Sequence, residues 1–203
     1  MAIKLLAVIL LCLATSSSMF AVGEGKARQR AKESLKKGDF ETAEKQFREL
    51  LVKDAHDKDA RLGLSFSLLK QRRLQDAYDH AARVVLADPL SPRAHALLGS
   101  VILASGDFQN SVEEFKTALS IEDGEALAIA GLAMVDFYEN RLSLAIKGLR
   151  RAVAIDSSEP DYFFNLGQAT ARNELYKEAA DAYETFLAID RKPMRIVVPE
   201  YEG

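Results

Sequence analysis

Three histidines and one cysteine are the side chains from which this sequence could build a metal or nucleophilic site. His56, His80 and His95 could act as general bases or zinc ligands. However, no second histidine follows any of them at the four-residue spacing that places two ligands on one helix face. Cys12 alone forms no internal disulfide framework and no cysteine-rich metal centre. We therefore expect surface or packing histidines, and no metal or other cofactor.

Other catalytic signatures are also missing. The segment Gly63-Leu64-Ser65-Phe66-Ser67 ends in serine where a nucleophile elbow requires glycine. Glu113 and Glu114 are adjacent and fit a solvated helix face better than a paired acid/base site. No glycine-rich phosphate loop occurs. The sequence therefore predicts a protein that is not an enzyme.

Composition narrows the class of protein further. The chain has 203 residues, of which 48% are hydrophobic, enough for a folded core. It carries 27 Lys and Arg against 30 Asp and Glu, a net charge of −3. This balance argues against a nucleic-acid partner, since such proteins are usually basic.

The segment 1–23 has the pattern of a secretory signal peptide. Lys4 precedes an unbroken apolar run, Leu5 to Ala14, and small residues follow at Ala21 to Gly23. We predict cleavage after Gly23; cleavage after Ser18 or Ala21 is the alternative. The prediction is an exported protein of bacterial type, periplasmic or secreted. An uncleaved membrane anchor is the other interpretation, although this apolar run is too short to span a bilayer.

A basic cluster follows this leader: Lys26, Arg28, Arg30, Lys32, Lys36 and Lys37. Cations at this density could contact an acidic partner or a membrane surface. Ordinary solvated charge beside the leader is the favoured interpretation.

The remainder of the chain repeats with a period of 34 positions. The same residue class returns in five successive copies. We call the residues at one equivalent position of the five copies a phase. Two phases hold only small residues: Ala31, Ser65, Gly99, Ala133 and Gly167 in one, and Ala43, Ala77, Ser111, Ala145 and Ala179 in the other. A large apolar phase is Leu51, Val85, Leu119, Val153 and Leu187. The predicted repeats are 24–57, 58–91, 92–125, 126–159 and 160–193.

Each copy is expected to form two helices. Gly38, Gly106 or a polar residue such as Asn140 marks the turn between them. Pro92 and Pro160 open copies, at positions where a helix must begin. The two small phases should face each other, because helices approach closely only where side chains are small.

These phases resemble the tetratricopeptide repeat family. The leucines Leu64, Leu98, Leu132 and Leu166 fit as well, and so do the aromatic residues Phe47, Phe115 and Tyr183. The family's tryptophan is absent, and His95, Ile129 and Phe163 stand in its place. The resemblance covers residues 24–193 and implies an all-α fold, a right-handed superhelical solenoid of five helix-turn-helix repeats.

In this family the first helices of the repeats line a concave groove. The resemblance places these residues on it: Arg28, Lys32, Leu62, Phe66, Leu69, Ser100, Leu103, Met134, Phe137, Phe164 and Gln168. About half of such positions should pack between helices instead of contacting a ligand. The groove would be apolar in its middle and basic near its start. It would suit an amphipathic helix or extended segment of another protein. The acidic C-terminal tails of chaperones, which some family members bind, are not expected as ligands here. Leu62, Phe66 and Ser100 occupy positions where polar side chains would be needed to bind such tails.

The last segment, 194–203, is not expected to be helical, because Ile196-Val197-Val198 is β-branched and Pro199 follows. Without a further helix, Tyr176, Ala180, Tyr183 and Leu187 would be left partly uncovered. The tail could fold over them, another chain could cover them in a homo-oligomer, or the chain could belong to a longer protein.

The sequence thus predicts an exported, non-enzymatic repeat scaffold that binds a protein or peptide. Two alternatives stay open at this stage. One is the N-terminal module of a larger secreted or envelope enzyme. The other is an envelope assembly factor held in the membrane by an uncleaved leader.

Overall fold

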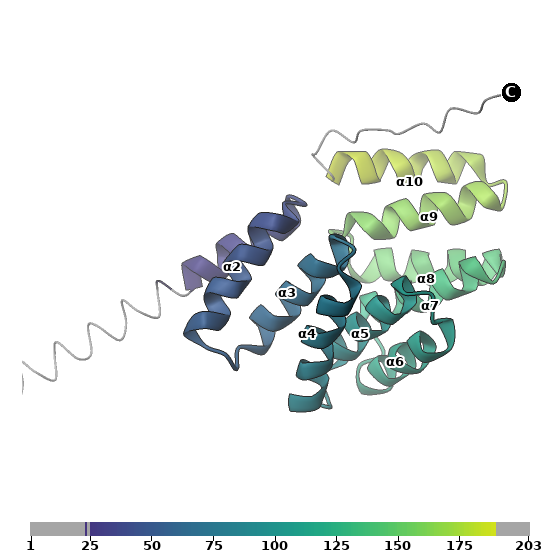
Figure 1. Cartoon of the computed structure of the whole chain (residues 1–203). Helices are drawn as coiled ribbons and strands as arrows, with labels where there is room; N and C mark the ends of the chain where they lie inside the picture. The colour runs from purple at the N-terminus through teal and green to yellow at the C-terminus, as the bar shows by residue number, and fades with distance from the viewer. Residues whose placement is uncertain (1–22, 24, 190–203) are drawn as a thin grey trace, which may run out of the picture. The chain divides into compact units, whose positions relative to one another are not determined.

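The computed structural model describes residue 23 and residues 25–189, which form ten helices (Figure 1). The N-terminal helix covers residues 25–36. The others are α2 (Phe40–Lys53), α3 (Lys58–Lys70), α4 (Leu74–Ala87), α5 (Pro92–Ala104), α6 (Phe108–Ile121), α7 (Ala126–Tyr138), α8 (Leu142–Ile155), α9 (Pro160–Arg172) and α10 (Tyr176–Ile189). The all-α prediction is confirmed. The predicted leader, apart from Gly23, and the predicted tail lie outside the described residues.

The helices pack in sequential pairs, within two compact units that divide at Val84 and Val85. Each predicted copy contains one pair. In the second unit α5 packs on α6, α7 on α8 and α9 on α10, and α7 also contacts α5 and α9. A chain of neighbouring pairs replaces the single central core of an ordinary domain. The handedness of the superhelix stays a prediction.

The turn inside each pair depends on one left-handed residue. Gly38, Arg72, Gly106, Asn140 and Glu174 all have positive φ, between 62° and 92°, and each lies one repeat period after the last. Glycine and asparagine adopt this conformation at little cost, whereas arginine and glutamate do not. The turn positions predicted at Gly38, Gly106 and Asn140 are therefore confirmed. The repeat geometry also imposes the same conformation on two residues that do not favour it.

Helix starts are fixed by side chains that cap the free backbone N–H groups. Asp39, Asp57, Ser91 and Asp107 each accept a hydrogen bond from the backbone three residues later. The predicted helix starts at Pro92 and Pro160 are confirmed, since each proline is the first residue of its helix.

Small residues let the two helices of a pair approach closely. Every member of both small phases is buried. In the second pair, the Ser65 hydroxyl donates a 2.7 Å hydrogen bond to the Ala77 carbonyl, which joins the two phases directly. The predicted contact between the small phases is confirmed there.

At two junctions between neighbouring pairs, an aromatic ring packs against a glycine. Phe47 on α2 packs so tightly on Gly63 of α3 that a Cβ added to that glycine would overlap the ring. In the second unit Phe115 on α6 makes the same contact with Gly131 of α7. Phe47 is 2% exposed and Phe115 is fully buried. Glycine is required at these positions for close approach to the ring.

We therefore expect Gly131→Ala to lower the free energy of unfolding by about 1–3 kcal/mol, because the added methyl overpacks the Phe115 contact. Gly124→Ala is the matched control, since nothing lies within 4 Å of its added Cβ. That control should change stability by less than about 0.5 kcal/mol. Urea unfolding followed by circular dichroism measures both. Equal stability of the two variants would show that the ring and the glycine can separate without cost.

Candidate functional site

The predicted groove residues of the first unit lie on the N-terminal helix and α3. Leu62, Phe66 and Leu69 are half-buried on α3, so each combines a packing role with an accessible surface. The Lys70 ammonium lies 5.1 Å from the centre of the Phe66 ring. Cation–π attraction therefore places a positive charge beside this apolar residue. The surface at Phe66 is mixed, apolar and cationic.

Arg28 binds a carboxylate of its own chain. Its guanidinium contacts Asp57 at 2.8 and 2.9 Å, and the Asp57 side chain is only 8% exposed. Asp57 also caps α3 by accepting a hydrogen bond from the Ala60 amide at 2.9 Å. Partial burial alone would raise the pKa of Asp57, but the Arg28 and backbone hydrogen bonds outweigh it and lower that pKa. Arg28 therefore offers a partner less free charge than its sequence position implies, while Lys32 is exposed.

In the second unit, the predicted residues are half-buried on three first helices. Ser100 and Leu103 lie on α5, Met134 and Phe137 on α7, and Phe164 and Gln168 on α9. Leu103, Met134 and Phe137 also pack against the buried core. The Ser100 hydroxyl donates to the Ala96 carbonyl at 2.8 Å, so its hydrogen is already committed. Met134 and Phe137 are the side chains here that best combine apolar character with access.

Phe137 belongs to a wider aromatic and cationic cluster. The Arg172 guanidinium lies 5.1 Å from its ring centre, and the Tyr138 ring is 5.7 Å away, edge-on. Tyr138 in turn stacks on Phe108 at 5.5 Å with the rings nearly parallel. Tyr138 is not among the residues predicted from the sequence. An aromatic residue at the last position of a first helix is the signal that could have identified it.

Phe164 points toward the second helix of its own pair. Its ring centre is 5.3 Å from that of Phe186 and 6.0 Å from that of Tyr183, both on α10. The contact favours helix packing for Phe164 over ligand binding, in line with the expected share of packing residues.

A fixed ion pair lies where α5 and α7 begin. Arg93 contacts Glu125 at 2.9 Å, and the Glu125 side chain is largely buried. The Arg93 side chain is 49% exposed, and its partial desolvation would lower its pKa, but Glu125 and Tyr162 raise that pKa. Burial also raises the pKa of Tyr162, partly opposed by the Arg93 charge. Near neutral pH, Arg93 is therefore protonated and paired with the Glu125 carboxylate, and Tyr162 is neutral. The sequence analysis did not identify Glu125 or Tyr162.

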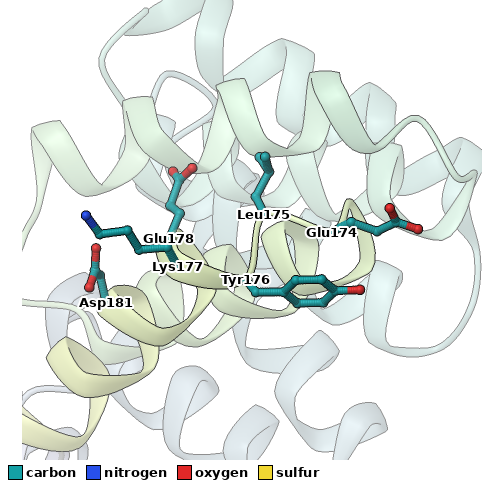
Figure 2. A pocket seen from close by; sticks show the side chains of 6 residues that line it. All are labelled: Glu174, Leu175, Tyr176, Lys177, Glu178 and Asp181. Carbon is teal, nitrogen blue, oxygen red and sulfur yellow. The ribbon is translucent and has the colours of Figure 1, made fainter.

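The end of the last pair is open. Leu187 is 54% exposed, whereas the four residues at its phase in earlier copies are half-buried. Tyr176 is 69% exposed, Ala180 is exposed and Tyr183 is half-buried. The prediction that these four residues are partly uncovered is confirmed. Figure 2 shows the adjoining surface hollow at the start of α10, lined by Glu174, Leu175, Tyr176, Lys177, Glu178 and Asp181.

The histidines have structural surroundings. The ring nitrogens of His95 lie 2.7 Å from a Glu114 oxygen and 3.0 Å from the Pro89 carbonyl, which ties α5 to α6 and to the preceding loop. His80 is half-buried, and its pKa is lowered first by burial and then by nearby arginines. His56 is exposed. The expectation of surface or packing histidines is confirmed.

Two further findings concern the described residues alone. Across 25–189, no group of three or more histidine, cysteine or acidic side chains is arranged to hold a metal ion. None of the helices in this range has the length and apolar character needed to cross a membrane.

Comparison with known proteins identifies repeats in both halves of the chain. Two tetratricopeptide repeat models match residues 34–101 and 131–192, which together make up more than half of the sequence. Neither model describes an enzyme. No curated protein gave a match.

Several solved structures share the fold. A thermophilic TPR protein of Thermus thermophilus, TTC0263, superposes with a TM-score of 0.70 at 17% identity, covering 83% of this chain and 92% of that one. The APC/C hetero-tetramer Cut9–Hcn1 gives 0.67 at 15% identity, covering 84% of this chain and 38% of that one. Pseudomonas aeruginosa PilF gives 0.56 at 16%, covering 85% and 80%.

We expect Asp57→Ala to lower the free energy of unfolding by about 1–3 kcal/mol, since it removes a helix cap and leaves Arg28 without its main partner. The pKa of Asp57 is lowered from 3.8, so its contribution is present near neutral pH and is lost on acidification through that pKa. The variant should accordingly lose less stability than the wild type as the pH is lowered through 3.8 and below.

Asp59→Ala is the control for this measurement. Asp59 lies 4.0 Å from Arg28 and is 74% exposed, so its removal should cost less than about 1 kcal/mol. Urea unfolding at each pH compares the two variants. An equal effect of both would contradict the role given to the Arg28–Asp57 pair.

Proposed function

Because the chain belongs to the tetratricopeptide repeat family, we propose that it is an exported, non-enzymatic scaffold that binds another protein or peptide through its first helices. The observation that carries this proposal is the half-buried state of Phe66, Met134 and Phe137. Contiguous apolar patches on a folded surface usually mark a partner site.

The surroundings of these residues define the chemistry of the partner. Arg172 lies over Phe137, so an acidic group beside an apolar anchor would satisfy both. Methionine adapts its shape to varied apolar surfaces, which suits Met134 to an amphipathic helix or an extended segment. We therefore propose a partner segment with apolar anchors flanked by carboxylates.

The double variant Phe66→Arg plus Met134→Lys should abolish partner capture. Each change places a charge where an apolar anchor of the partner would have to be buried, at a cost that typically exceeds tenfold in affinity. The partner is first identified by affinity capture and mass spectrometry, and the variants are then compared by titration with the purified partner.

The matched control is Val52→Arg plus Leu144→Lys. It introduces the same charges at exposed apolar residues of second helices, on α2 and α8. Capture by the control and loss with the groove variant, with unchanged helical circular dichroism, would support the assignment. Full capture by the groove variant would refute it.

Export is the part of the proposal that rests on the leader pattern of residues 1–23. The mature protein isolated from an exporting host should begin at Glu24. N-terminal sequencing tests this, and a start at Met1 in a membrane fraction would instead favour the anchored assembly factor.

A second candidate function follows from the open face of α10. Exposure of Tyr176 and Leu187 favours a further segment against this end, as expected if the repeats are the N-terminal module of a larger exported enzyme. Translation of the gene beyond the codon for Gly203 distinguishes the two. A catalytic domain in the same reading frame would support the module, and a stop codon would exclude it.

A further inference from the structure

We propose that the outward face of the N-terminal helix, residues 25–36, is a docking surface for an anionic lipid bilayer. Five cations form this face, defined here as the cationic face: Lys26, Arg30, Lys32, Lys36 and Lys37, the last in the turn that follows the helix. All five are exposed. The inward side of the same helix carries Ala31, which is fully buried, and half-buried Leu35. The helix is therefore anchored by one side and presents its charges on the other.

The inward and outward cations differ in their partners. Arg28 turns inward and binds Asp57 at 2.8 Å. Among the described residues, no carboxylate forms an ion pair with any cation of the cationic face. Glu33 is the acidic residue on that side, and its carboxylate accepts a hydrogen bond from Gln29 at 3.1 Å. The charge of the cationic face thus remains available to an external anionic surface.

The charge is concentrated in this helix and not shared by the protein. Residues 25–37 carry a net charge of +5, whereas the whole chain has −3, so the remainder carries −8. Such polarity orients a molecule in the field of an anionic surface, with the helix foremost. A uniformly charged protein of this net charge would be repelled.

The composition of the face favours a bilayer over an acidic protein. Its exposed positions between residues 25 and 37 hold only glycine, glutamine, glutamate, lysine and arginine. Specific protein partners depend on buried aromatic or apolar anchors, and none is exposed here. Attraction of clustered lysines and arginines to anionic headgroups requires no such anchor.

Vesicle co-sedimentation tests the proposal. The purified protein is mixed with vesicles of phosphatidylcholine alone or of phosphatidylcholine with phosphatidylglycerol. We expect stronger binding to the anionic vesicles, reversed by salt. The variant Lys26→Gln, Lys36→Gln, Lys37→Gln should lose affinity by about fivefold per removed charge. Lys32 is left intact because it belongs to the predicted groove, so a defect of the variant is distinguishable from failure of the proposed function.

The matched control, Lys45→Gln, Lys53→Gln, Lys147→Gln, removes the same charge from exposed lysines elsewhere. It should bind anionic vesicles as the wild type does. Any contribution of the apolar leader would act on neutral and anionic vesicles alike, so the ratio between the two is the readout. Equal binding to both vesicles, or equal losses in the variant and the control, would overturn the proposal. Salt-reversible binding of the face to an acidic protein but not to anionic vesicles would overturn it as well.

Discussion

Close packing between successive helix pairs is the constraint on which this fold depends, and at two junctions it takes the form of an aromatic ring against a glycine. Phe47 against Gly63 joins the first pair to the second, and Phe115 against Gly131 joins the third to the fourth. A helix pair has too little apolar surface to form a core alone, so it is stable only when a neighbour covers it. The glycine lets the backbone come down onto the ring and exclude water.

The turns and helix ends stabilise the packing of the helix pairs. A left-handed turn residue returns once in every repeat and reverses the chain so that the second helix lies against the first. At Arg72 and Glu174 the fold imposes this conformation on side chains that disfavour it. Local strain is therefore accepted at the turn because the tertiary contacts around it are worth more. The ion pair of Arg28 with Asp57 works in the same direction, since it fixes the start of α3 against the N-terminal helix.

Three kinds of surface remain once the stacking is satisfied, and each suits a different interaction. First helices leave Phe66, Met134 and Phe137 partly open, beside the cations Lys70 and Arg172. The N-terminal helix presents exposed charge without exposed apolar side chains. The last helix leaves the apolar residues Tyr176 and Leu187 uncovered at the place where a following pair would lie. We propose a peptide, a lipid surface and a further folded segment as their respective partners.

The period, the helix pairs, the turn positions and the buried small phases all follow from the order of residues, because each copy must bury the same positions and so keeps the same residue types at the same spacing. Tertiary contacts, in contrast, settle the orientation and the partners of individual side chains. Arg28 binds Asp57, Phe164 packs on Phe186, and Arg93 is held by Glu125. Each partner lies on another helix or is the residue that caps that helix. The repeat pattern does not distinguish its position from the equivalent positions in other copies. Which charge is left unpaired and which ring is left accessible depends on the side chains that the neighbouring helix places within a few ångströms. A repeat pattern in the sequence does not specify those distances.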